Sequence, residues 1–167
     1  MNKSVSLVLL STALLALAGC ASNQGTSPKG LEVPIEKAAI KFAADTRASS
    51  YKVVGTEELK KWVDSGQKPL IISALPVEED KQLGLIPGAV NAYMPKSEKE
   101  VTKTDREKLL KAAGSDKDRL IVIYCGFVSC SRSHHGANIL IENGYRNVYR
   151  YPAGITGWME SGYPVTK

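Results

Sequence analysis

The chain has 167 residues and an ordinary globular composition, 43% hydrophobic, 7% aromatic and 23% charged, which suits one domain with a real core. Its formal net charge is +5, with no block of Lys and Arg and no interleaved aromatic residues. This charge favours small anionic ligands weakly and argues against a nucleic-acid partner.

The N-terminus differs from the rest of the chain. Lys3 supplies one positive charge, residues 5–17 are almost wholly apolar, and Leu17-Ala18-Gly19-Cys20 closes the run. An apolar run this short that ends in small residues is typical of a secretory signal rather than a membrane span. The closing tetrapeptide resembles the bacterial lipobox, in which a peptidase cuts before the cysteine and the cysteine carries lipid. We therefore predict a signal peptide over residues 1–19 and lipidation of Cys20; a buried core helix with an incidental cysteine is the alternative.

Residues 20–50 are expected to connect this lipid anchor to the domain. Residues 21–30 are small, polar and punctuated by Pro and Gly, so they should form a flexible tether. Residues 31–50 are rich in Ala and Lys, which indicates a helical or partly ordered lead-in. These features predict an exported lipoprotein at the periplasmic face of a membrane. Since Ala21 supplies no acidic retention signal, the outer membrane is slightly preferred.

From residue 51 to residue 167, short apolar runs alternate with amphipathic ones, which predicts βαβ units and a parallel sheet in one domain. The expected strands are residues 51–54, 70–73, a short one delivered by the turn at 86–91, 120–124 and 148–151. Four helices are expected. The first has Thr56 as its N-cap, and the second starts with a capping box over Thr104–Glu107. The third runs from about Arg132 to Asn143, and the fourth starts at Gly154.

Cys125 ends the strongest predicted strand, and the loop after it leads into the helix that begins near Arg132. In open α/β sheets the ligand site lies at such strand ends. Successive backbone N–H groups and the helix dipole form an anion-binding concavity there. A thiol in that concavity should ionise more easily than a free one, and the thiolate is the nucleophile. Cys125 is therefore the predicted nucleophile, with Arg132 as a fixed positive charge beside it.

Each of these residues also has a structural interpretation. Cys125 could be a small buried hydrophobe, Arg132 a solvated helix residue, and Cys130 a disulfide partner of Cys125 without chemistry, which an oxidising compartment favours. The two cysteines could also join His134 and His135 in a metal site. We expect no metal there, because adjacent helical histidines diverge by about a hundred degrees and the spacing matches no common zinc pattern.

Several separated motifs resemble the rhodanese domain family. Ile86-Pro87-Gly88-Ala89-Val90-Asn91 matches the turn of the family's first half. The second half is similar in the pair Tyr124-Cys125, the loop that follows, the pair Arg132-Ser133, the segment Gly144-Tyr145-x-Asn147-Val148-Tyr149 and the segment 153–165. The likeness covers residues 51–165 and is strongest for exported rhodanese-like members with two cysteines in the loop.

This resemblance implies a three-layer α/β fold with a five-stranded parallel sheet flanked by helices. It also implies a thiosulfate sulfurtransferase-like activity that uses no cofactor. Cys125 would accept sulfane sulfur from a small anion such as thiosulfate and pass the persulfide to a thiol or cyanide-like acceptor. The amides of the substrate-binding loop would stabilise the thiolate, the persulfide and the donor. That loop consists of Gly126, Phe127, Val128, Ser129, Cys130, Ser131 and Arg132.

The chain departs from the family pattern at three positions and in the length of its loop. Ser73 and Leu75 stand where many members carry Asp and Arg, and Leu85 stands where many carry His. Six residues separate Cys125 from Arg132, against four in the common form. The rhodanese-like cell-cycle phosphatases have five residues there, so phosphatase activity is a further alternative that we do not expect.

The second loop cysteine suggests a redox hypothesis. If Cys125 holds the persulfide, attack by Cys130 would expel sulfide and leave a Cys125–Cys130 disulfide, so Cys130 is a candidate resolving thiol. The alternative function is a non-catalytic or redox sulfur-binding module in which the two cysteines form that disulfide.

Overall fold

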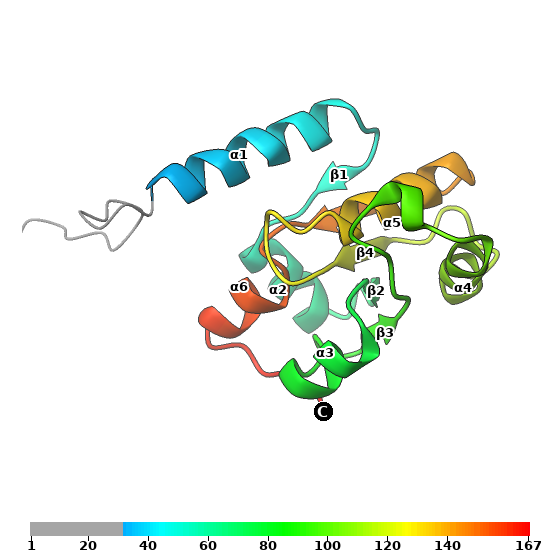
Figure 1. Ribbon diagram of the computed structural model, residues 1–167. Helices are drawn as coiled ribbons and strands as arrows, with labels where there is room; N and C mark the ends of the chain where they lie inside the picture. The colour runs from blue at the N-terminus through cyan, green and yellow to red at the C-terminus, as the bar shows by residue number, and fades with distance from the viewer. Residues whose placement is uncertain (1–31) are drawn as a thin grey trace, which may run out of the picture.

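The computed structural model describes residues 32–167 (Figure 1). The predicted signal peptide, lipidated Cys20 and flexible tether lie outside the described residues. Within residues 32–167, no helix is both long and apolar enough to cross a membrane.

Five parallel strands form one sheet in the order β1-β5-β4-β2-β3. The central strand β4 pairs with β2 on one side and with β5 on the other. Every residue of β2 and β4 is buried, which accounts for their continuous apolar sequences. The strands are β1 (Lys52–Val53), β2 (Leu70–Ser73), β3 (Val90–Asn91), β4 (Ile121–Tyr124) and β5 (Val148–Tyr151).

Helices cover both faces of this sheet, so the fold has three layers. α4 and α5 pack against each other and α5 covers β4 and β5, while α2, α3 and α6 lie on the opposite side of the sheet in Figure 1. The helices are α1 (Glu32–Arg47), α2 (Thr56–Asp64), α3 (Val77–Leu83), the 3-10 helix η1 (Glu98–Glu100), α4 (Lys103–Ala113), α5 (Arg132–Glu142) and α6 (Gly154–Glu160). The expected three-layer α/β fold with a five-stranded parallel sheet is therefore confirmed.

A glycine brings α5 close to the sheet at the end of β4. A Cβ atom on Gly136 would lie only 2.4 Å from Ile123 Cδ1, so a larger residue could not pack there without a shift of the helix. The close approach fixes the N-terminus of α5 beside the last residues of β4. The loop between these two elements therefore has both of its ends held.

The strand order also determines where a ligand can bind. The chain passes from β2 outward to β3 and, on the other side, from β4 outward to β5, so the order reverses between β2 and β4. Ligand sites of open α/β sheets lie at such a reversal, beyond the carboxyl ends of the strands. The segments that leave β2 and β4 at this edge begin with Ala74 and Cys125.

The predicted helix starts needed two corrections. Gly55, not Thr56, is the N-cap of α2, and the Thr56 hydroxyl instead bonds to the Tyr151 hydroxyl at 2.9 Å. The capping box of α4 is formed by Thr102 and Asp105, because the backbone of Thr102 is extended and the helix already starts at Lys103.

Candidate active site

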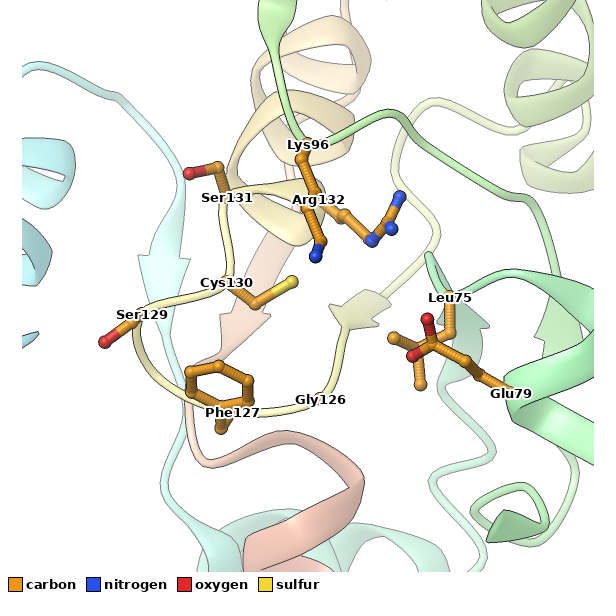
Figure 2. Close-up of a pocket in the computed structure, with 9 residues that line it drawn as sticks. All are labelled: Leu75, Glu79, Lys96, Gly126, Phe127, Ser129, Cys130, Ser131 and Arg132. Carbon is orange, nitrogen blue, oxygen red and sulfur yellow. The ribbon is translucent and has the colours of Figure 1, made fainter. Parts of the chain in front are cut away.

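The loop from Cys125 to Ser131 connects β4 to α5 and forms one wall of a cavity of about 260 Å³. Leu75 and Glu79, which follow β2, lie across the space from Cys130 and Lys96 (Figure 2). The cavity therefore lies at the point where the strand order reverses. Its lining consists of Leu75, Glu79, Lys96, Gly126, Phe127, Ser129, Cys130, Ser131 and Arg132.

The thiol of Cys130 faces this cavity in an environment that favours its ionised form. The Cys125 thiol and the backbone N–H groups of Arg132 and Gly126 favour negative charge on its sulfur. Together with the charge of Arg132, these groups outweigh burial and lower the pKa of Cys130 to about 6. The lowered pKa increases the thiolate fraction of Cys130 at neutral pH.

Cys125 lies behind Cys130 and does not line the cavity. Its side chain is 1% exposed, and its sulfur lies 3.2 Å from the Ser133 hydroxyl, 3.4 Å from the carbonyl oxygen of Cys130 and 3.9 Å from that of Phe127. Burial, the hydrogen bond to Cys130 and the negative charge of Cys130 raise the pKa of Cys125 well above its usual value. One backbone N–H, that of Ser133, favours a Cys125 thiolate, whereas the N–H groups of Arg132 and Gly126 favour the thiolate of the neighbouring cysteine.

Two cations and one acid give the cavity its charge. Lys96 points its ammonium group into the same space as the Cys130 sulfur, as Figure 2 shows. Arg132 is buried and fixed, because its Nη1 donates to the carbonyl oxygen of Met94 at 2.6 Å and its guanidinium lies over the ring of Tyr93. Glu79 is the acid on the opposite wall. A small anion can therefore be held beside Cys130 by Lys96 and Arg132.

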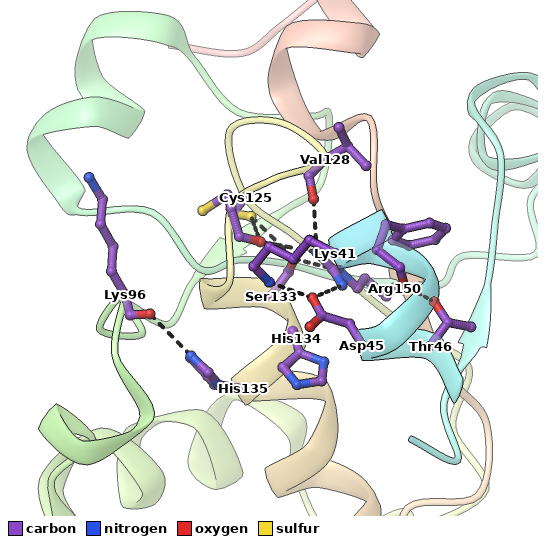
Figure 3. Close-up of polar contacts among 12 residues, drawn as sticks. Lys41, Asp45, Thr46, Lys96, Cys125, Val128, Ser133, His134, His135 and Arg150 are labelled. Carbon is purple, nitrogen blue, oxygen red and sulfur yellow. Dashed lines mark hydrogen bonds and ion pairs between the residues drawn. The ribbon is translucent and has the colours of Figure 1, made fainter. Parts of the chain in front are cut away.

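A fully buried arginine holds the outer part of the loop from behind. Arg150, in β5, has 0% exposure and donates from Nη2 to the carbonyl oxygens of Val128 and Cys130 at 3.2 and 3.0 Å (Figure 3). Its Nε donates to the Ser133 hydroxyl at 3.2 Å, the same hydroxyl that contacts Cys125. One guanidinium thus positions the surroundings of both thiols.

The charge of Arg150 is balanced by a carboxylate from α1. Its Nη1 donates to Asp45 Oδ2 at 3.1 Å and to the Tyr51 hydroxyl at 3.2 Å, and the guanidinium lies over the ring of Phe42. Burial alone would raise the pKa of Asp45, but hydrogen bonds from Lys41 and Arg150 and nearby positive charge lower it overall. α1 buries none of its own residues, so these contacts attach its C-terminal half to the domain.

The inner end of the loop is held by the N-terminus of α6. The backbone N–H groups of Ile155 and Thr156 donate to the carbonyl oxygens of Cys125 and Gly126 at 2.9 and 3.1 Å. Gly154 has a φ of +62°, and a Cβ atom there would lie 2.2 Å from the carbonyl oxygen of Cys125. Only glycine allows α6 to approach the loop backbone this closely.

The structure also describes the three positions at which the chain departs from the family pattern. Ser73 donates to a carboxylate from a different element, Asp80 of α3, at 2.7 Å, and Asn91 donates to the other oxygen of that carboxylate. Leu75 lines the cavity, and Leu85 pairs with Thr166 near the end of the chain. A buried carboxylate thus contacts Ser73, at the position where many family members carry Asp. The position where many carry Arg has the apolar side chain of Leu75.

The two histidines considered for a metal site point to different partners. His134 Nδ1 bonds to the Tyr51 hydroxyl at 2.9 Å, and His135 Nε2 bonds to the carbonyl oxygen of Lys96 at 3.2 Å. Among residues 32–167, no three His, Cys, Asp or Glu side chains are grouped so that they could hold a metal ion.

Sequence reasoning brought together Cys125 and the loop from Gly126 to Arg132, and most of this loop lines the cavity. It missed five residues of the site: Asp45, Glu79, Lys96, Arg150 and Gly154. A signal for Arg150 was present, because a charged residue in a strand that is otherwise apolar is rarely buried without a partner. Lys96 lies in an irregular segment, and its sequence carries no signal that it would face the loop.

A family model described as a rhodanese-like domain matches residues 55–161. No curated protein matches the sequence. This matched range contains four of the five strands, β2 to β5, together with the cavity and both loop cysteines.

Solved structures of three proteins show the same fold at low identity. A rhodanese-related protein from Thermoplasma volcanium is 21% identical, with a TM-score of 0.52, over 70% of this chain and 98% of its own. The polysulfide-sulfur transferase homodimer from Wolinella succinogenes is 17% identical, with a TM-score of 0.55, over 82% and 90%. The human single-domain sulfurtransferase is 21% identical, with a TM-score of 0.51, over 66% and 97%.

Proposed function

Since this chain belongs to the rhodanese-like domain family, we propose that it is a sulfurtransferase whose two-cysteine loop carries sulfane sulfur as a persulfide. The donor is a small anion such as thiosulfate, and the sulfur passes to a thiophilic acceptor, either a thiol or a cyanide-like nucleophile. The reaction needs a thiolate, a site for the anionic part of the donor, and groups that stabilise a persulfide anion.

The observation that carries this proposal is the placement of an ionisable thiol in a cationic cavity. The Cys130 thiol lines the cavity together with Lys96 and Arg132, and backbone N–H groups of the loop contribute to its lowered pKa. The cations would bind the sulfonate of thiosulfate, while the N–H groups would stabilise negative charge on sulfur before and after transfer. A volume of about 260 Å³ suits a small anion better than a drug-sized molecule.

Mass spectrometry of the intact protein tests the proposal. The full chain is used with Cys20→Ser, which removes the cysteine outside the domain, and it is reduced before incubation with thiosulfate. We expect one added sulfur atom at early times and an equivalent amount of sulfite, and neither product in the variant that also carries Cys125→Ser and Cys130→Ser. A reduced wild-type loop that takes up no sulfur and releases no sulfite would refute the sulfurtransferase function. Rapid closure to a Cys125–Cys130 disulfide in that case would support the non-catalytic or redox module.

We also propose that the protein is an exported lipoprotein anchored through Cys20 at the periplasmic face of a membrane, preferably the outer membrane. The support is the sequence of residues 1–20 described above. Fractionation of cells that express the full chain tests this location. Wild-type protein is expected in the membrane fraction and the Cys20→Ser variant in the soluble periplasmic fraction, whereas equal distribution of the two would contradict lipid anchoring.

A further inference from the structure

The two loop thiols differ in access to the cavity, and this difference assigns them separate steps. We propose, building on the proposed function, that Cys130 takes the sulfur from the donor and that Cys125 then resolves the persulfide, so that the protein releases the transferred sulfur as sulfide. The activity is reduction of a sulfane sulfur donor at the expense of the loop dithiol. These roles are the reverse of those predicted from the order of the cysteines in the sequence.

Access supports the role of Cys130. An attacking thiolate must reach the outer sulfur of the donor, and the Cys130 side chain lines the cavity beside Lys96 and Arg132. The Cys125 side chain is 1% exposed, does not line the cavity, and is enclosed by Ser133 and the backbone of the loop. A donor that enters the cavity therefore meets Cys130 first.

The polar groups around each sulfur support the same assignment. The backbone N–H groups of Arg132 and Gly126, the Cys125 thiol and the charge of Arg132 lower the pKa of Cys130, so this environment favours a thiolate and a persulfide anion on a side chain that also lines the cavity. Two carbonyl oxygens lie near the sulfur of Cys125 and would repel negative charge there, which keeps that thiol protonated. Cys125 is thus suited to deliver a proton and to attack last.

In the first step, the Cys130 thiolate attacks the outer sulfur of thiosulfate. A bond forms between the Cys130 sulfur and that sulfur, the sulfur–sulfur bond of thiosulfate breaks, and sulfite leaves with the electron pair. The products are the Cys130 persulfide anion, which the loop N–H groups stabilise, and sulfite, which remains close to Lys96 and Arg132 until it dissociates.

In the second step, the Cys125 proton passes to the outer sulfur of the Cys130 persulfide, and the Cys125 thiolate formed in this way attacks Cys130 Sγ. A bond forms between the two cysteine sulfurs, the sulfur–sulfur bond of the persulfide breaks, and the outer sulfur leaves toward the cavity with the electron pair, so the products are hydrogen sulfide ion and a Cys125–Cys130 disulfide. The sulfane sulfur is reduced and the two thiols are oxidised. Because the two cysteines lie five positions apart on one loop and Cys125 Sγ is 3.4 Å from the carbonyl oxygen of Cys130, the disulfide can form within the site. An external dithiol must reduce it before the next cycle.

A single-turnover experiment tests the two roles. The reduced full chain with Cys20→Ser is mixed with thiosulfate, quenched with acid, and analysed for sulfite, sulfide and the position of the added sulfur. Chymotryptic cleavage after Phe127 separates the two cysteines into different peptides. We expect the early persulfide in the Cys130 peptide, followed by equal amounts of sulfide and disulfide.

Single variants separate the steps. Cys125→Ser should keep the sulfite burst, hold the persulfide on Cys130 and release no sulfide; Cys130→Ser should show no sulfite burst. Cys125→Ala replaces the serine variant if that protein fails to fold. A Ser115→Ala variant, which changes an exposed hydroxyl outside the cavity, serves as the control for handling.

Several results would overturn the assignment while the sulfurtransferase function stands. These are an early persulfide on Cys125 in the wild-type protein, a sulfite burst retained by Cys130→Ser, or a wild-type persulfide that persists without sulfide release. Absence of both sulfite and persulfide would instead refute the proposed function itself, so the two failures are distinguishable.

Discussion

Replacement of Arg150 by methionine should destabilise the protein and slow its sulfur chemistry. The guanidinium is 0% exposed and its N–H groups go to Asp45, Tyr51, Ser133 and the carbonyl oxygens of the loop. Methionine fills similar space but leaves the loop carbonyl oxygens without their donor and leaves Asp45 with Lys41 as its remaining ion-pair partner. Breaking a buried ion pair costs about 3–5 kcal/mol, and because the Asp45 side chain retains 14% exposure and its contact with Lys41 we expect about 3 kcal/mol here.

Chemical denaturation measures this cost, and Arg146→Met provides a matched control. Arg146 lies in the same part of the chain and pairs with Asp118, but both side chains are largely exposed, so its loss should not shift the midpoint detectably. A double variant, Asp45→Asn with Arg150→Met, removes the partly buried carboxylate that has lost the Arg150 guanidinium and should recover about 1 kcal/mol. Sulfite release by Arg150→Met should fall about tenfold or more, because the loop loses its positioning.

Two results would refute this reasoning about Arg150. One is a denaturation midpoint for Arg150→Met that equals that of Arg146→Met. The other is a normal rate of sulfite release in an Arg150→Met protein that is folded, since the loop carbonyl groups would then be positioned by something else.

Three further predictions concern the cavity and the loop. The rate at which iodoacetamide alkylates Cys130 should rise with a midpoint near pH 6 and then level off, because the lowered pKa of Cys130 makes the thiolate available above that pH. A midpoint near the pKa of a free cysteine, about 8.5, would contradict the environment described for Cys130. Gly154→Ala should destabilise the protein by at least about 2 kcal/mol, because a Cβ atom would meet the carbonyl oxygen of Cys125. In thermal unfolding, Gly162→Ala, with a similar φ but no neighbour within 4 Å, should cost only about 1 kcal/mol, and equal losses would remove the argument from close approach. Lys96→Ala should raise KM for thiosulfate by up to about fivefold, and added salt should weaken this effect. Lys99 is exposed and lies outside the cavity, so Lys99→Ala should not change KM. Equal KM values for the two variants in steady-state assays would exclude Lys96 from donor binding.

Much of the fold could be predicted because the central strands have an unmistakable pattern. The runs Leu70–Ser73 and Val148–Tyr151 have the same bounds in the sequence and in the structure, and α5 begins at Arg132 as expected. α3 was not predicted, because its sequence, VEEDKQL, has too few apolar residues for a helical period. The order of the strands depends on long-range pairing, which local patterns do not contain.

The candidate site was only partly predictable for a related reason. The strand end and the loop after Cys125 identify a thiol site, but the direction in which each thiol points depends on the path of six loop residues. That path is set by Arg150, Gly154 and Asp45, which lie far from the loop in sequence. Sequence order favoured Cys125 as the nucleophile, whereas burial and N–H contacts favour Cys130.

The guanidinium of Arg150 bonds both to α1 and to the loop that contains the two cysteines. The docking of α1 and the conformation of this loop are therefore thermodynamically linked. Whatever free energy Asp45 and Phe42 contribute to docking of α1 also favours the loop conformation that Arg150 holds. Linkage is reciprocal, so a disulfide that shifts the carbonyl groups bonded to Arg150 changes the docking of α1 by as much as α1 docking changes the free energy of disulfide formation. Hydrogen exchange of the α1 amides should therefore differ between the dithiol and disulfide forms. The redox state of the two cysteines would in this way change the rate of amide exchange in α1, at the outer surface of the domain.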